Sequence, residues 1–188
     1  MYVDGDYAFS VTAEDYFSLN LYEKKEIAKE EIDHIKNTVN FRSAKSSAIK
    51  FLSLKIRTEQ EVRKKLERDG YDRETSENAV NELKAMGYIN DRMYVQKYVF
   101  DRSKLKPKAK NLIRYELQNK GIDSDEIDEV LDDWDVDEKD VAASLVRRKF
   151  GKYDLQDEKI RKKVYAFLSH RGYGYELIES LFRNEFNG

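Results

Sequence analysis

The sequence predicts an all-α protein: three tandem three-helix repeats in an elongated array, with a small N-terminal appendage of a hairpin and a helix. Three observations support this prediction. Only 1 of the 188 residues is proline and 8 are glycine, so few residues interrupt helices. Charged residues make up 38% of the chain and hydrophobic residues 40%, a balance that suits thin helical layers with much exposed surface. The third observation is an internal repeat.

The repeat is marked by three glycines. Gly70, Gly121 and Gly172 are 51 residues apart, and each stands between a charged residue and an apolar or aromatic one. Glycine directly after a helix adopts the left-handed conformation that ends it. Each glycine therefore predicts the end of a helix and fixes the register of one repeat.

An apolar ladder precedes each glycine. Four residues before the glycines are Leu66, Leu117 and Leu168, and eight residues before them are Val62, Ile113 and Val164. A spacing of four places these side chains on one face of a helix. A further helix is expected after each glycine, with Asp72 as the N-cap in the first repeat.

Each repeat also has a helix before the ladder helix, expected near residues 44–55, 91–103 and 138–150. Thr58 and Glu61 form a capping-box pattern at the start of the first ladder helix, and Pro107 is expected at the first position of the second. We expect these divisions: residues 1–42 as the appendage, 43–90 as repeat 1, 91–136 as repeat 2 and 137–188 as repeat 3.

The appendage begins with a turn. Asp4 and Gly5 are typical of a type I′ hairpin turn, although almost no strand precedes them. Thr12 with Asp15 predicts the N-cap of a short helix. A helical pattern resumes at Lys29, and the Ser- and Asn-rich residues 37–47 are expected to bend or break it.

Basic residues gather near the ladder helices, although the net charge is only −2. One interpretation is a basic surface in every repeat that suits phosphates or an acidic protein. The other is solvated helix faces with internal ion pairs. The segment 104–110 is the strongest individual candidate, because it leads into a helix N-terminus whose N–H groups attract anions.

Acidic residues gather in residues 123–140. Asp133, Asp135 and Asp137 have the spacing of calcium-loop ligands, but Glu138 and Ser144 stand where that loop requires glycine and glutamate. These acids fit helix N-terminal turns or a basic partner better than a metal. Trp134, among them, is expected to be a core anchor between repeats.

Several function classes lack their motifs. The chain has no cysteine, which excludes disulfides and thiolate chemistry, and a reducing cytoplasm is the expected compartment. There is no membrane-length apolar run, no secretory signal and no glycine-rich phosphate loop. The many tyrosines fit packing better than base stacking. We therefore expect a binding protein with no catalytic residue, no metal and no cofactor.

Seven segments share their residue types and order with one family: residues 4–10, 58–66, 87–92, 106–108, 120–122, 148–150 and 171–173. They resemble the RecX family of bacterial regulators of the RecA recombinase. The resemblance covers nearly the whole chain. One departure is the start of the chain, because members of that family carry a longer strand before the hairpin turn.

The resemblance implies a monomeric regulator that binds the RecA–DNA filament, with possible contacts to DNA phosphates, and that mainly inhibits the ATPase and strand exchange of RecA. It also implies a role in recombination, DNA repair and the SOS response. A stand-alone helical DNA-binding module and a metal-dependent nuclease are the alternatives. The expected filament- or DNA-binding residues are Arg63, Lys64, Lys65, Arg68, Lys104, Lys106, Lys108, Lys110, Arg114, Arg147, Arg148, Lys149, Lys152, Arg161, Lys162 and Lys163.

Overall fold

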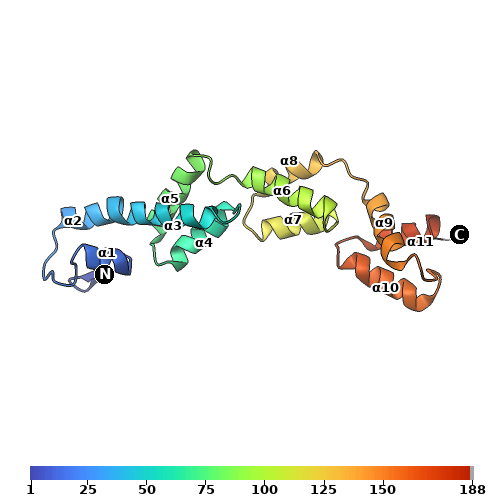
Figure 1. Cartoon of the computed structure of the whole chain (residues 1–188), viewed down its shortest axis with the longest axis horizontal. Coiled ribbons are helices and arrows are strands. Elements are labelled where there is room, and N and C mark those ends of the chain that lie inside the picture. The colour runs from blue at the N-terminus through green and yellow to red at the C-terminus, as the bar shows by residue number, and fades with distance from the viewer. Residues whose placement is uncertain (187–188) are drawn as a thin grey trace. The chain divides into compact units, whose positions relative to one another are not determined.

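A computed structural model describes residues 1–186 and confirms the predicted fold class: a small N-terminal hairpin precedes three tandem three-helix repeats (Figure 1). The elements are β1 (Tyr2–Val3), β2 (Asp6–Tyr7), α1 (Ala13–Ser18), α2 (Lys29–His34), the π-helix η1 (Ile35–Asn40), α3 (Phe41–Leu52), α4 (Glu59–Arg68), α5 (Arg73–Ala85), α6 (Asp91–Lys104), α7 (Lys110–Gln118), α8 (Ser124–Asp132), α9 (Glu138–Phe150), α10 (Glu158–Ser169) and α11 (Tyr175–Asn184).

The hairpin is very short. Asp4 has φ 52° and Gly5 has φ 93°, as a type I′ turn requires. Only two residue pairs form the ladder, Tyr2 with Tyr7 and Val3 with Asp6. A ladder of this length is marginal in water, so the hairpin depends on packing against the rest of its unit.

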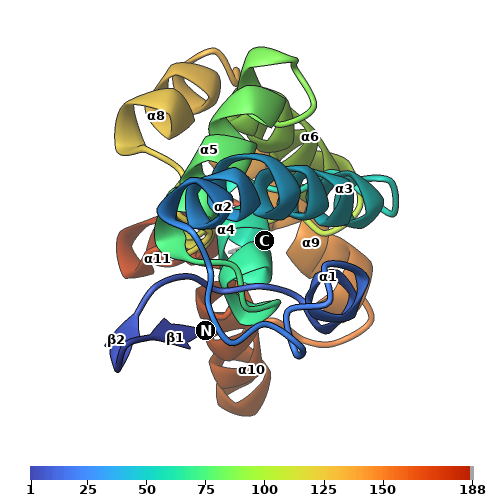
Figure 2. The ribbon, with the colours of Figure 1, turned by 90° about the vertical axis from the view of Figure 1, so that its left-hand side faces the viewer.

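A separate apolar cluster provides that packing. Phe9, Leu21 and Ile35 are 0%, 4% and 1% exposed, and they join the segment after the hairpin to the helical segment that begins with α2. The Asn40 side chain also donates to the Ser10 carbonyl. In both views the hairpin and α1 lie on the same side of α2 and α3 (Figures 1 and 2).

Where a bend or break was expected, the structure has a π-helical turn. Helix α2 continues through η1 into α3, and His34 and Asn40 both have helical φ and ψ at the two junctions. A π turn inserts an extra residue into the helix, which rotates the faces that follow it. The Ser- and Asn-rich segment is therefore helical, and Phe41, the residue after η1, packs on the core of repeat 1.

The apolar ladder is confirmed in all three repeats. Helices α4, α7 and α10 are the ladder helices, and their Leu66, Leu117 and Leu168 are 0% exposed, as are Val62, Ile113 and Val164. Burial of six such side chains supplies the main stabilising term, because each contributes about 1.5–3 kcal/mol when fully buried. The flanking helices of each repeat complete its core.

The register glycines end the ladder helices as expected. Gly70, Gly121 and Gly172 have φ of 96°, 80° and 85°, a region that side chains with a Cβ rarely adopt. The Tyr71 and Tyr173 N–H groups donate to the Leu66 and Leu168 carbonyls, both at 3.2 Å. This bond is the long hydrogen bond of a Schellman cap.

The contacts divide the chain into two compact units. Unit 1 comprises residues 1–94 and 120–122, and unit 2 comprises residues 95–119 and 123–188. In unit 1, the Thr58 hydroxyl donates to the Lys120 carbonyl at 3.0 Å, and the Asp91 carboxylate accepts from the Glu59 N–H at 2.9 Å. These bonds attach residues 120–122 and the first turn of α6 to the start of α4.

Unit 2 contains the corresponding arrangement at the start of α7, with the carboxylate again supplied by the first residue of the next repeat's first helix. The Ala109 N–H donates to the Arg171 carbonyl at 2.9 Å, and the Glu138 carboxylate accepts from the Lys110 N–H at 2.5 Å. Ala109 occupies the position of Thr58, and Arg171 that of Lys120. The repeats therefore also share the contacts by which residues later in the chain hold the start of a ladder helix.

Two local predictions at this point are wrong. Helix α7 begins at Lys110 rather than at Pro107, because the Ala109 N–H is bonded to Arg171 and Ala109 remains extended. Trp134 is half-buried rather than a core anchor, and the Lys110 ammonium lies 5.7 Å from its ring centroid. In both cases tertiary contacts that no local pattern encodes decide the result.

Candidate functional site

The sixteen expected binding residues lie on α4, on the segment from α6 into α7, and on α9 and α10 with the turn between them. Helical spacing keeps most of them on the faces opposite the buried ladder. Their charges are not equally available to a partner. Seven are engaged in ion pairs with carboxylates: Arg63, Lys65, Lys108, Arg114, Arg147, Arg161 and Lys162.

In repeat 1 the ladder helix neutralises much of its own charge. Arg63 pairs with Glu59 at 2.6 Å, and Lys65 pairs with Asp69. A hydrogen bond from Lys84, together with the charges of Lys84 and Arg63, lowers the pKa of Glu59 despite its partial burial. Of the four expected residues here, only Lys64 and Arg68 form no ion pair within residues 1–186, and Lys64 donates to a glutamine.

In repeat 2 the Glu116 carboxylate accepts hydrogen bonds from both Tyr98 and Lys108. Burial alone would raise the pKa of Glu116, but hydrogen bonds from Lys108 and Tyr98 and the charges of Lys108 and Arg102 lower it. The Tyr98 hydroxyl donates to Glu116 at 2.7 Å. Lys108 is therefore part of a partly buried polar network rather than a free cation.

The start of α7 is a weaker anion site than the sequence indicates. The N–H groups of Ala109 and Lys110 are already bonded to the Arg171 carbonyl and the Glu138 carboxylate. Anion binding at a helix N-terminus requires N–H groups that have no partner. Lys104 and Lys106, which precede the helix, are exposed and form no ion pair among residues 1–186.

Repeat 3 carries both kinds of cation. Arg147, Arg161 and Lys162 pair with Glu185, Glu179 and Glu158. Its other expected residues are exposed and have no carboxylate partner in the described part of the chain: Arg148, Lys149, Lys152 and Lys163. The third repeat therefore presents the largest group of uncompensated expected residues.

Two hollows lie beside these cations in unit 2, with volumes of about 430 and 350 Å³. His170 and Arg171 line both of them, and neither wall contains an aspartate or glutamate. The expected binding set omitted both residues. The signal for them was their place at the end of a basic ladder helix, where His170 is the C-cap and Arg171 precedes the register glycine.

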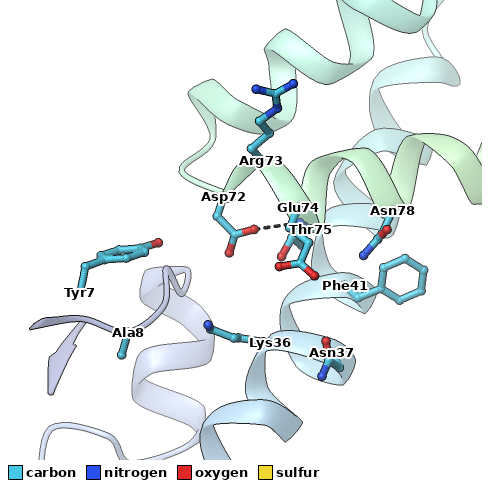
Figure 3. A pocket seen from close by; sticks show the side chains of 10 residues that line it. All are labelled: Tyr7, Ala8, Lys36, Asn37, Phe41, Asp72, Arg73, Glu74, Thr75 and Asn78. Atoms are coloured by element: carbon cyan, nitrogen blue, oxygen red, sulfur yellow. Dashed lines mark hydrogen bonds between the residues drawn. The ribbon is translucent and has the colours of Figure 1, made fainter.

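A third hollow, in unit 1, has walls of mixed charge. It has a volume of about 540 Å³ and lies between the hairpin, η1, α3 and the start of α5. In Figure 3 Lys36 and the carboxylate of Asp72 extend toward this space, while Arg73 is directed away from it. Asp72 is occupied as the N-cap of α5 through the Thr75 N–H at 2.8 Å. This balance of charge favours no particular ligand.

Two other kinds of functional element, a metal cluster and a membrane-spanning helix, are absent from the described residues. Within residues 1–186 no three His, Asp or Glu side chains are placed to hold a metal ion. In the same range, no helix has the length and apolar character needed to cross a membrane.

Comparisons with known proteins place these elements in a family. Sequence models described as the first, second and third three-helix domains of RecX match residues 44–83, 90–131 and 137–182. A relative from Clostridium botulinum (strain Alaska E43 / Type E3), named "Regulatory protein RecX", is 34% identical, and the alignment covers 100% of this chain and 89% of that one.

Solved structures give the same result for the fold. A structure titled "Crystal structure of regulatory protein RecX" has a TM-score of 0.72 at 27% identity, and the match covers 97% of this chain and 93% of the other. RecX from Lactobacillus salivarius matches with a TM-score of 0.66 at 22% identity, over 77% of this chain and 95% of the other. This second likeness supports the fold alone.

Proposed function

The chain belongs to the RecX family of regulatory proteins, and from that premise we propose that it binds the RecA–DNA filament and mainly inhibits its ATPase and strand exchange. The observation that carries the proposal is the match of three RecX domains in their order along the chain. The relatives are named as regulatory proteins, and the proposed role is binding without catalysis or cofactor. We place this role in recombination and DNA repair in the cytoplasm.

The sixteen basic residues named from the sequence remain the proposed contact set, and their pairing gives them an order of importance. A cation already paired with a carboxylate must give up that partner before it binds another anion, so its net gain is small. We therefore expect Lys104, Lys106, Arg148, Lys149, Lys152 and Lys163 to contribute more than Arg63, Lys65 or Lys108.

The experiment for the proposed function is ATP hydrolysis by RecA on single-stranded DNA. The purified protein should reduce the turnover rate at amounts near or below one molecule per RecA. An unchanged rate at large excess, with the added protein shown to be folded by its circular dichroism spectrum, would contradict the proposal.

A matched pair of variants separates free from paired cations. Replacing Lys106 by Gln should weaken the inhibition, because this side chain is exposed and uncompensated. Replacing Lys108 by Gln should have the smaller effect on inhibition, because Lys108 is held by Glu116. Equal losses in the two variants would mean that pairing within the chain does not determine contact with the filament.

A stand-alone DNA-binding module is the second candidate function, favoured by the uncompensated cations on α9 and α10. It requires tight binding to DNA in the absence of RecA, with an affinity that falls steeply as salt rises. Tight binding to bare DNA together with no effect on RecA turnover would favour this candidate over the filament regulator.

A further inference from the structure

The two hollows of unit 2 form one basic surface, here called the double hollow. Its cationic walls are Lys106, Lys108, Arg148, Lys149, Lys163 and Arg171. Arg171 and His170 belong to both hollows and so join them. The cations come from α9, α10 and the segment before α7, so tertiary packing brings together residues that are far apart in the sequence.

Most of this charge is uncompensated. Lys106, Arg148, Lys149 and Lys163 are exposed and form no ion pair within residues 1–186, whereas Lys108 is neutralised by Glu116. No carboxylate lines either hollow. Low-dielectric walls around charges of one sign concentrate the electric field, which raises the local concentration of anions.

An aromatic ring positions two of the cations without cancelling their charge. The Lys149 ammonium lies 4.2 Å and the Arg171 guanidinium 3.8 Å from the centroid of the Phe167 ring. Arg171 also donates to the Phe167 carbonyl at 3.0 Å. Cation–π attraction restrains these side chains and leaves their positive charge available to an anion.

The composition of the walls indicates which polyanion fits. Lysine is depleted in protein–protein interfaces because its ammonium group is strongly hydrated, whereas lysine and arginine together provide most contacts to nucleic-acid phosphates. The aromatic rings are not free for base stacking, since Phe150 is 6% exposed and cations lie over the Phe167 ring. Contacts of this kind carry no information about base sequence.

We propose that the double hollow binds the phosphodiester backbone of DNA through Arg148, Lys149 and Lys163, with Lys106 at its edge, and without sequence preference. This inference rests on the proposed function in taking DNA as the polyanion, and it assigns the DNA contact to the third repeat. The paired cations of α4 and α7 do not contribute to it.

The test is a salt titration of the affinity for a labelled duplex in the absence of RecA, measured by fluorescence anisotropy. A variant with Arg148→Gln, Lys149→Gln and Lys163→Gln should lower the slope of log affinity against log salt by about 2 to 3, since each duplex phosphate contact adds about 0.9. The matched control is Arg42→Gln, Lys50→Gln and Lys55→Gln, which removes the same types of exposed cation from unit 1 and should leave the slope unchanged.

The single variant Lys163→Gln provides a second measurement that is independent of the Phe167 contacts. It should lower the slope by about 1. Circular dichroism spectra and urea midpoints equal to those of the unmodified chain show that each variant is folded. Affinities for duplexes of different base composition should agree, and a strong sequence preference would contradict backbone binding.

The outcomes separate this inference from the proposed function. Equal slope losses in the triple variant and its control would overturn the assignment to the third repeat. Inhibition of RecA without binding to bare DNA would also overturn the assignment of DNA to the double hollow. It would indicate an acidic protein surface as the ligand there, and it would remain consistent with the proposed filament regulator. The expected slope changes with no effect on RecA turnover would confirm the inference and contradict the proposed function.

Discussion

Helices α4 and α10 occupy the same position in repeats 1 and 3, but the two repeats differ in how many of their expected cations lack a carboxylate partner among residues 1–186: two in repeat 1 and four in repeat 3. Their inner faces match, since Val62, Leu66, Val164 and Leu168 are all 0% exposed. On the outer face of α4, Arg63 and Lys65 are paired with carboxylates of the same segment. On α10, Arg161 and Lys162 are paired as well, but Lys163 and the neighbouring Lys149 of α9 have no such partner among residues 1–186.

The repeat therefore fixes the core more strictly than the surface. Loss of a ladder residue leaves a cavity in a close-packed interior, whereas exchange of a surface charge has little effect on stability. Repeat 2 lies between the two cases, since Glu116 neutralises Lys108 while Lys104 and Lys106 remain uncompensated. Equal cores therefore support surfaces with unequal uncompensated charge.

The largest expected effect tests the equality of the cores. Leu66→Ala and Leu168→Ala should each lower the free energy of unfolding by about 2–5 kcal/mol, because each removes a fully buried side chain and leaves a cavity. Urea unfolding followed by circular dichroism measures both losses. A loss of unfolding free energy below about 1 kcal/mol in only one of the two variants would show that the two cores are not equivalent.

A smaller difference is expected between two register glycines. Gly70→Ala should cost about 1–2 kcal/mol from the left-handed backbone alone, since no atom lies within 4 Å of the added Cβ. Gly172→Ala should cost about 1–3 kcal/mol more, because its Cβ would overlap the Cβ of Leu112. Equal unfolding free energies for the two variants would mean that unit 2 relaxes to admit the methyl group.

Acid should weaken the paired repeats. Glu59 and Glu116 have lowered folded-state pKa values, so their contribution to stability is present above about pH 4.3, their ordinary value, and is lost as pH falls through the lowered pKa. Burial and the nearby Glu59 charge raise the pKa of Asp91, which acts in the opposite direction.

Urea unfolding at pH 6 and at pH 3.5 measures this loss. In the variant Glu59→Gln with Glu116→Gln the unfolding free energy should be lower at pH 6 and should depend less on pH between the two conditions. An unchanged pH dependence would mean that these two ion pairs contribute little to stability.

A small effect is expected when a paired cation of the double hollow is made uncompensated. Glu116→Gln removes the carboxylate that neutralises Lys108 and leaves the Tyr98 hydroxyl an amide oxygen to donate to. Freed from its partner, Lys108 in the wall of the double hollow should raise the salt slope of duplex binding by up to about 1. A lower slope in this variant would contradict the role that we assign to uncompensated charge.

Much of the fold was predictable because it depends on local patterns. The glycine spacing, the apolar ladder, the Thr58–Glu61 capping box and the start of α9 at Glu138 all follow from residues close together in the sequence. The division into residues 1–42, 43–90, 91–136 and 137–188 stays a prediction. The start of α7 was misplaced at Pro107 because the hydrogen bond from Ala109 to Arg171 joins residues that are far apart in the sequence. The burial of Trp134 was overestimated because its half-buried position beside Lys110 follows from no local pattern.

The proposed binding surface was predictable only as a composition of charge. Sequence alone placed sixteen cations near the ladder helices. It could not show that Lys108 forms an ion pair with Glu116 whereas Lys106 does not. His170 and Arg171 gain their place from packing that brings the end of α10 beside the segment before α7.

The sequence by itself determined the repeat, its register and its buried faces, because helix periodicity and glycine caps act over a few residues. Beyond the i,i+4 pairs Arg63–Glu59, Lys65–Asp69 and Lys162–Glu158, tertiary structure decided which cations remain uncompensated, and it decided which residues line the double hollow. The physical reason is range: an apolar side chain is buried by its own helix's periodicity, whereas a charge is neutralised or left free by whichever side chain the fold brings within a few ångströms of it.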